Sequence, residues 1–159
     1  MFHFEEQSSE GLAYIPLSVR FHLDASGCRI SLAQWQALPL SEREAVCALP
    51  VPADSREATR ACVARLSAAL QAAGETPLAQ EREAPLSHAG AGVGEDAREL
   101  PAAVARQAAL HQVAPPTAQA WCALDRFQRY ALIKLSRRDT PNHDFLPALR
   151  EFGLLSEAG

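Results

Sequence analysis

A clear helical pattern lies in residues 55–74, which read SREATRACVARLSAALQAAG. Its apolar side chains recur at intervals of four, at Ala58, Cys62, Leu66 and Leu70. This spacing places them on one face of an α-helix. We expect Ser55 to cap the start of the helix and Gly74 to end it. The stretch therefore predicts a helix that packs one side against the rest of the protein.

The composition of the whole chain favours helices in the same way. Ala and Leu supply 51 of the 159 residues, whereas Val, Ile and Thr together supply 14. Ala and Leu have high helix propensity, and β-branched residues favour strands. We therefore expect an all-α fold, a compact single-domain bundle of about six or seven helices. At residues 1–15 we expect a short strand or an extended arm.

Local signals place the other helices. Besides the 55–74 segment, we expect helices at residues 16–27, 31–38, 41–49, 100–113, 118–136 and 145–152. Ser41 and Glu44 stand in the S-x-x-E relation of a capping box, which marks a helix start. Thr117 is expected to cap the longest helix, which runs to about Ser136. The expected core residues are Trp35, Leu66, Leu70, Trp121, Leu124 and Leu135.

Residues 75–99 differ in composition from the rest of the chain. They contain three glycines, two prolines and a net charge of −4. A long segment of this kind inside a compact domain is either mobile or functional, and we expect a mobile acidic loop here. The single domain is expected to span residues 1–159.

Overall charge and hydropathy exclude several classes of protein. The net charge is −4 and the pI is about 5.7, whereas a nonspecific nucleic-acid binder needs a basic surface. We therefore expect no nucleic-acid partner. No stretch of about 18 residues is continuously apolar, so we expect no membrane span. The early acidic residues Glu5 and Glu6 do not fit a signal peptide, and we expect a cytoplasmic protein.

The four cysteines do not form a metal-binding pattern. Cys28, Cys47, Cys62 and Cys122 are widely spaced, with no C-x-x-C pair. Structural zinc sites normally show closely spaced ligand pairs, so a zinc site formed by His22 with three of these thiols is disfavoured. We expect buried thiols, no metal and no cofactor.

No pair of residues carries a convincing signal for catalysis. Side chains one or two positions apart do not face each other on a helix, which argues against His22 with Asp24 and against His143 with Asp144. Asp144 is expected to cap the last helix, and Asp24 to pair with Arg20. We therefore expect that the protein is not an enzyme.

A basic cluster stands out in this acidic chain. Between Thr117 and Asp139 there are five positive and two negative charges. Its members, expected mostly off the buried stripe of the helix, are Arg126, Arg129, Lys134, Arg137 and Arg138. Positive charges near a helix C-terminus complement the helix dipole, which is one explanation. The other is a docking patch for an acidic partner, since arginine binds carboxylates in a bidentate manner.

Two stretches of sequence resemble a known family. The first is IPLSVRFHLD at residues 15–24, which continues to Trp35. The second is QRYALIKLSR at residues 128–137, which continues into FLPALREFG at 145–153. Both are similar to the nitrate reductase-associated proteins, a family that includes the cyanobacterial factor needed for maturation of assimilatory nitrate reductase. The resemblance covers roughly residues 2–50 and 117–154.

The resemblance implies an accessory role, without catalytic residues, in the maturation or activation of a molybdenum-cofactor enzyme. The expected partner is a protein client, with nitrate reductase as the first candidate. We expect the client contacts to be charged residues of the two stretches and of the basic cluster. They are Arg20, Asp24, Arg126, Arg129, Arg137 and Arg138. A small enzyme or cofactor carrier in nitrate or molybdopterin metabolism is the first alternative, and a nucleic-acid-binding regulator is the second.

Overall fold

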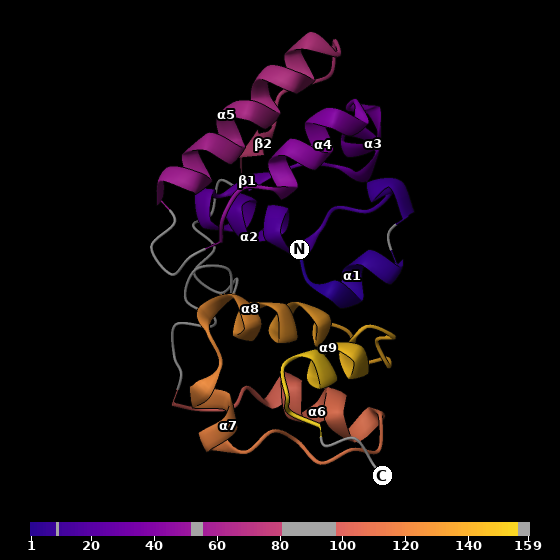
Figure 1. The fold of residues 1–159 in the computed structure, drawn as a ribbon, viewed down its shortest axis with the longest axis vertical. Coiled ribbons are helices and arrows are strands. Elements are labelled where there is room, and N and C mark those ends of the chain that lie inside the picture. Colours follow the sequence, from indigo (N-terminus) through magenta and orange to yellow (C-terminus); the bar gives the residue numbers. More distant parts are fainter. Residues whose placement is uncertain (9, 52–55, 81–97, 156–159) are drawn as a thin grey trace. The chain divides into compact units, whose positions relative to one another are not determined.

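The computed structural model describes residues 1–8, 10–51, 56–80 and 98–155. They belong to two compact units, Met1–Ala91 and Gly92–Gly159. The described residues are mostly helical, with a single pair of two-residue strands, which confirms the all-α prediction (Figure 1). Within these ranges no helix is both long and apolar enough to cross a bilayer.

The first unit contains most of the helices. In chain order its elements are α1 (His3–Ser8), the 3-10 helix η1 (Glu10–Leu12), α2 (Leu17–Ser26), β1 (Cys28–Arg29), α3 (Leu32–Ala37), α4 (Leu40–Cys47), α5 (Arg56–Ala72) and β2 (Ala79–Gln80). The expectation of a strand or extended arm at residues 1–15 is wrong, because α1 and η1 lie there. One cause is Glu5, whose carboxylate accepts hydrogen bonds from the backbone N–H of Phe2 at 3.0 Å and of Leu17 at 2.7 Å. These bonds satisfy N–H groups at the starts of α1 and α2, which have no partner inside their own helix.

The core of the first unit forms where α5 packs against α2 and α4. Cys62, Leu66 and Leu70 of the predicted α5 stripe are each 0% exposed. Trp35 of α3 is equally buried, and its indole Nε1 donates to the Leu12 carbonyl at 2.8 Å. The predicted helical face is therefore confirmed. Ser55, its expected cap, lies outside the described residues.

The small sheet was not predicted. Gly27 ends α2 with a φ of 68°, in the left-handed region that glycine adopts without strain. The chain then turns into β1, where Cys28 pairs with Gln80 and Arg29 with Ala79 in an antiparallel arrangement. The start of the expected 75–99 loop is thus fixed to the helical core. Residues 81–97 of that loop lie outside the described residues.

The predicted capping box at Ser41 and Glu44 is wrong. Helix α4 begins at Leu40, directly after Pro39, so Ser41 lies inside the helix. Proline fixes its own φ near the helical value, which allows it to start the helix without a side-chain cap. A capping box does occur ten residues earlier, where the Ser31 hydroxyl accepts from the Gln34 N–H at 3.1 Å.

The second unit contains α6 (Ala102–Leu110), α7 (Ala118–Ala123), α8 (Arg126–Leu135) and α9 (Phe145–Glu151). The prediction of one helix over 118–136 is wrong, because the chain breaks between α7 and α8. Leu124 is extended, with a ψ of 147°, and Asp125 caps α8. The Asp125 carboxylate accepts from the Gln128 N–H at 2.7 Å, and the Gln128 side chain accepts from the Asp125 N–H at 3.0 Å. This capping box stabilises the start of α8, so α7 and α8 do not form one continuous helix.

Buried apolar side chains form the interior of the second unit. Trp121, Leu132, Phe145 and Leu149 are each 0% exposed. Leu124 and Leu135 are also buried, so all six predicted core residues are confirmed. The Thr117 cap is confirmed as well, since its hydroxyl accepts from the Ala120 N–H at 3.1 Å.

Candidate functional site

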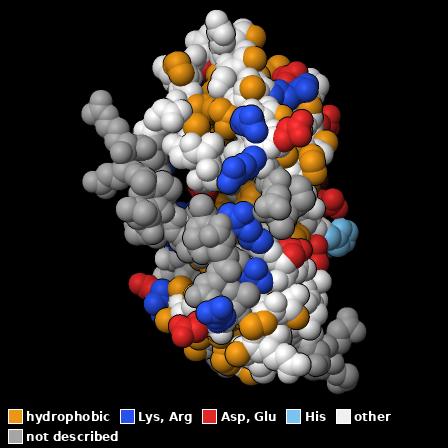
Figure 2. Space-filling model, turned by 90° about the vertical axis from the view of Figure 1, so that its left-hand side faces the viewer, with side chains coloured by type: hydrophobic (Ala, Val, Ile, Leu, Met, Phe, Trp, Pro, Cys, Tyr) orange, Lys and Arg blue, Asp and Glu red, His pale blue; other side chains and the backbone are white. Residues whose placement is uncertain are grey.

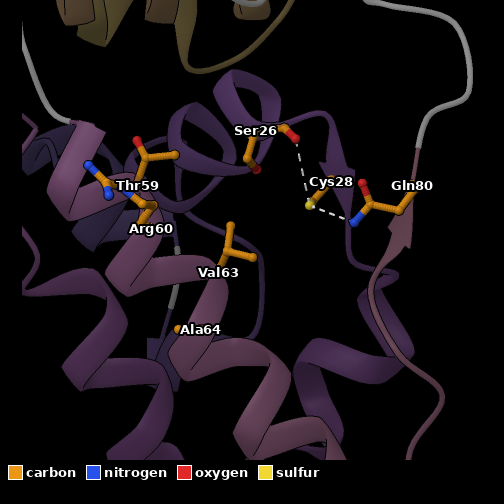
Figure 3. Close-up of a pocket in the computed structure, with 7 residues that line it drawn as sticks. All are labelled: Ser26, Cys28, Thr59, Arg60, Val63, Ala64 and Gln80. Carbon is orange, nitrogen blue, oxygen red and sulfur yellow. Dashed lines mark hydrogen bonds between the residues drawn. The ribbon is translucent and has the colours of Figure 1, made fainter.

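A cavity of about 470 Å³ opens in the first unit between the end of α2, the two strands and α5 (Figure 3). We call it the α5 pocket. Its lining consists of Ser26, Cys28, Thr59, Arg60, Val63, Ala64 and Gln80. Its volume is within the range of small-molecule sites, which is about 300–1,000 Å³.

Local backbone features assemble one wall of the α5 pocket. The left-handed turn at Gly27 brings Ser26 and Cys28 to the same end of α2, and strand pairing places Gln80 opposite Cys28. The Cys28 thiol accepts a hydrogen bond from the Gln80 amide Nε2 at 3.2 Å and donates to the Ser26 carbonyl at 3.8 Å. These bonds hold the wall together and engage the Cys28 thiol and the Gln80 amide nitrogen.

The opposite wall is one face of α5. Thr59 and Val63 are four residues apart, as are Arg60 and Ala64, so all four lie on neighbouring positions of the helix surface. In Figure 3, Val63 points from α5 into the space that Cys28 faces from the other side. The interior of the α5 pocket is therefore mainly apolar.

The rim of the α5 pocket, defined by Arg60 of the lining and Arg56 one turn earlier on α5, carries two positive charges. The Arg60 guanidinium turns back along α5, where its Nε donates to the Arg56 carbonyl at 3.4 Å. Within the described parts of the chain, neither Arg56 nor Arg60 forms an ion pair, whereas Arg65 of the same helix binds Glu42 at 2.9 Å. Helix α5 contains three arginines and a single acidic residue, Glu57. On the first unit, Figure 2 shows basic side chains (blue) beside apolar ones (orange).

Beneath the α5 pocket lies a buried histidine. His22 is 0% exposed, and its Nδ1 is 3.0 Å from the Thr59 hydroxyl, within hydrogen-bond distance. Burial lowers the pKa of His22 below its ordinary value, and a smaller opposing effect comes from the Pro50 carbonyl. The ring is neutral near pH 7 and joins α2 to α5. It thus has a structural partner in Thr59, which does not support a catalytic pair with Asp24.

The thiols are mostly buried. Cys28 and Cys62 are 4% and 0% exposed, Cys47 is half-buried and Cys122 is exposed. Burial raises the pKa of Cys62 to about 12 and that of Cys47 to about 11, so both stay protonated at neutral pH. In the described part of the chain, no group of three His, Cys, Asp or Glu residues is arranged to hold a metal ion.

The sequence-predicted client contacts lie in both units. Arg20 and Asp24 are on α2, where Arg20 is exposed and its Nε donates to the Ile15 carbonyl at 3.0 Å, while Asp24 is half-buried. The four other contacts are in the second unit. Arg126 is half-buried, and Arg137 and Arg138 are exposed in the turn after α8.

Arg129 and the neighbours His143 and Asp144 lie differently from what the sequence predicted. Arg129, expected off the buried stripe, is only 8% exposed, because it donates to the Leu124 carbonyl at the break between α7 and α8. His143 Nε2 does contact Asp144 Oδ1, at 3.3 Å, because His143 precedes α9 and is not held to helical geometry. Asp144 occupies the expected cap position, but its side chain makes no capping hydrogen bond.

A buried glutamine anchors the turn that carries the two exposed arginines. Gln107 of α6 is 1% exposed, and its Nε2 donates to the carbonyls of Arg138 at 3.0 Å and Thr140 at 2.9 Å. Its Oε1 accepts from the Asn142 N–H at 3.2 Å. These three bonds fix the backbone on which Arg137 and Arg138 are displayed.

Sequence reasoning missed the α5 pocket. The signal available was a second stripe on α5, because Arg56, Arg60 and Val63 follow the i, i+4, i+7 pattern of one helix face. The pairing of Cys28 with Gln80, which completes the cavity, has no comparable signal because the two residues are 52 positions apart.

Comparison with known proteins adds one finding. A family model described as a conserved nitrate reductase-associated protein matches residues 1–152. The matched range includes residues 51–116, which the two resembling stretches do not cover. No curated protein and no solved structure shows significant similarity to the chain.

Proposed function

The chain belongs to the nitrate reductase-associated protein family, and from this we propose that it is a non-enzymatic accessory protein for assimilatory nitrate reductase. It assists maturation or activation of this molybdenum-cofactor enzyme by protein–protein binding in the cytoplasm. The observation that carries the proposal is the family match over residues 1–152. A binding protein of this kind acts through different affinities for different states of its client.

The exposed arginines of the second unit are the favoured part of the client-binding surface. Arg137 and Arg138 have exposed side chains on a backbone that Gln107 anchors. A fixed backbone lowers the entropy lost on binding, and the guanidinium group suits bidentate binding of carboxylates. Arg20, Asp24, Arg126 and Arg129 remain candidate contacts of the same proposal.

The alternative candidate is a cofactor carrier or small enzyme. The volume of the α5 pocket, about 470 Å³, supports it. Its weakness is that several polar groups of that lining already have partners, as the Gln80 amide nitrogen has in Cys28 and the Thr59 hydroxyl in His22. Mass spectrometry of the purified native protein distinguishes the two, because a carrier retains a small molecule at a stoichiometric level.

The proposal is tested by affinity purification of the tagged chain from nitrate-grown cells. We expect nitrate reductase to be enriched with the wild type, less with Arg137→Glu, and at the wild-type level with Arg150→Glu. Arg150 is the matched control, because it is an exposed arginine at the end of α9, outside the proposed surface. Absence of the reductase from the wild-type sample would refute the function. Equal recovery with Arg137→Glu would refute this surface.

A further inference from the structure

The α5 pocket combines an apolar interior with a basic rim. Val63, Ala64 and Cys28 line the interior, whereas Arg60 lies at the edge with Arg56 one turn away. A ligand that fits both features has an apolar group next to negative charge.

We propose that the α5 pocket binds an apolar side chain from an acidic segment of the client protein, whose carboxylates meet Arg56 and Arg60. This inference rests on the proposed function, since it assigns the client a second contact surface. Neither arginine has an ion-pair partner in the described residues, so a client carboxylate gains the interaction without breaking a pair that these residues form.

The hydrogen bonding of the lining favours an apolar side chain over a small polar molecule. A cofactor site needs a few convergent polar groups that are free to bind the ligand. Here the Thr59 hydroxyl lies 3.0 Å from His22, and the Gln80 amide donates to Cys28. What remains for a ligand is mainly apolar surface, with the Gln80 amide oxygen and the positive rim.

The charge of the rim also argues against a second copy of this chain as the occupant. A symmetric dimer presents the same patch from both subunits. Arg56 and Arg60 of the two copies would then be brought together, and like charges at an interface cost binding energy. An acidic partner instead brings carboxylates to these arginines, so the charges across the interface attract each other.

Two substitutions on the exposed surface of α5 separate the two features of the pocket. Ala64→Gln fills the pocket without changing the charge, and Ala64 is exposed, so folding is preserved. Arg60→Gln removes one rim charge. Ala68→Gln and Arg65→Gln are the matched controls, because both positions lie on α5 outside the pocket lining.

The probes are overlapping peptides that span the nitrate reductase of the same cells, measured by fluorescence polarisation against the full chain. The peptides that bind are expected to share an apolar residue flanked by Asp or Glu. Ala64→Gln is expected to weaken their binding about tenfold, as loss of one buried apolar side chain would. Arg60→Gln is expected to weaken it about threefold, the size of an exposed ion pair. Each control is expected to stay within about twofold of the wild type.

The outcomes distinguish this inference from the proposed function. If the reductase co-purifies equally with the wild type and with Ala64→Gln, or if no peptide binds, the pocket assignment is wrong and the accessory function stands. If the reductase does not co-purify with the wild type, the function itself fails. A small molecule or a second copy of the chain displaced by Ala64→Gln would also overturn the assignment.

Discussion

Replacement of Gln107 by glutamate tests how the second unit holds its exposed arginines. The change is nearly isosteric, but it removes the two N–H donors that reach the carbonyls of Arg138 and Thr140. At neutral pH it also places a carboxylate oxygen about 3 Å from two carbonyl oxygens. Each lost hydrogen bond costs about 1 kcal/mol, and repulsion and burial of the charge add to this. We expect Gln107→Glu to lower the free energy of unfolding by about 3 kcal/mol.

The assay is urea unfolding of the full chain, with Gln128→Glu as the matched control. Gln128 occupies the third position of α8, where glutamate serves a capping box equally well, so the control should change stability by less than about 0.5 kcal/mol. Burial against carbonyls raises the pKa of the introduced carboxyl in the folded state. The defect should therefore shrink as the pH falls from 7 towards 5, because the protonated group can donate one bond. Equal stability of Gln107→Glu and Gln128→Glu would refute the role of Gln107.

Three further predictions concern buried groups. Burial lowers the pKa of His22 below its ordinary value of 6.5, so as the pH falls the imidazole is protonated in the unfolded chain before it is protonated in the folded one. Its contribution to the free energy of unfolding is therefore fully present above pH 6.5 and is lost as the pH falls below that value. The urea midpoints at pH 7.5 and 5.5 should differ less for His22→Gln than for the wild type. Iodoacetamide should modify exposed Cys122 in the native protein but Cys62 only after unfolding, as peptide mass spectrometry would show. Trp35→Phe should lower the free energy of unfolding by about 2 kcal/mol, because it leaves a void and removes the indole hydrogen bond to the Leu12 carbonyl, which keeps only its bond from Arg43 at 2.9 Å. An unchanged melting temperature would contradict this.

The elements that sequence predicted well are those whose signal is local. The α5 stripe of Cys62, Leu66 and Leu70 is buried as expected, because a period of four on one helix needs only that some partner covers it. The Gly27 turn and the Thr117 cap are also set by neighbours in the sequence.

The sequence predictions were wrong or incomplete where two local signals compete, or where a residue far away in the sequence determines the local structure. The helix over 118–136 breaks because the capping box of Asp125 and Gln128 outweighs continuous helical propensity. The helical N-terminus depends on Glu5, which binds the start of α2 twelve residues away. The α5 pocket depends on Gln80 reaching Cys28 across 52 positions, a contact that no local pattern indicates.

We propose that this chain binds nitrate reductase and favours one state of it. Isothermal titration of the purified full chain into the reductase, prepared once without and once with its molybdenum cofactor, measures this directly. We predict binding to both or one of these forms, with affinities that differ by at least about tenfold, because equal affinity shifts no equilibrium between them. Absence of binding would refute the proposed function, and equal affinity for the two forms would refute its preference for one state.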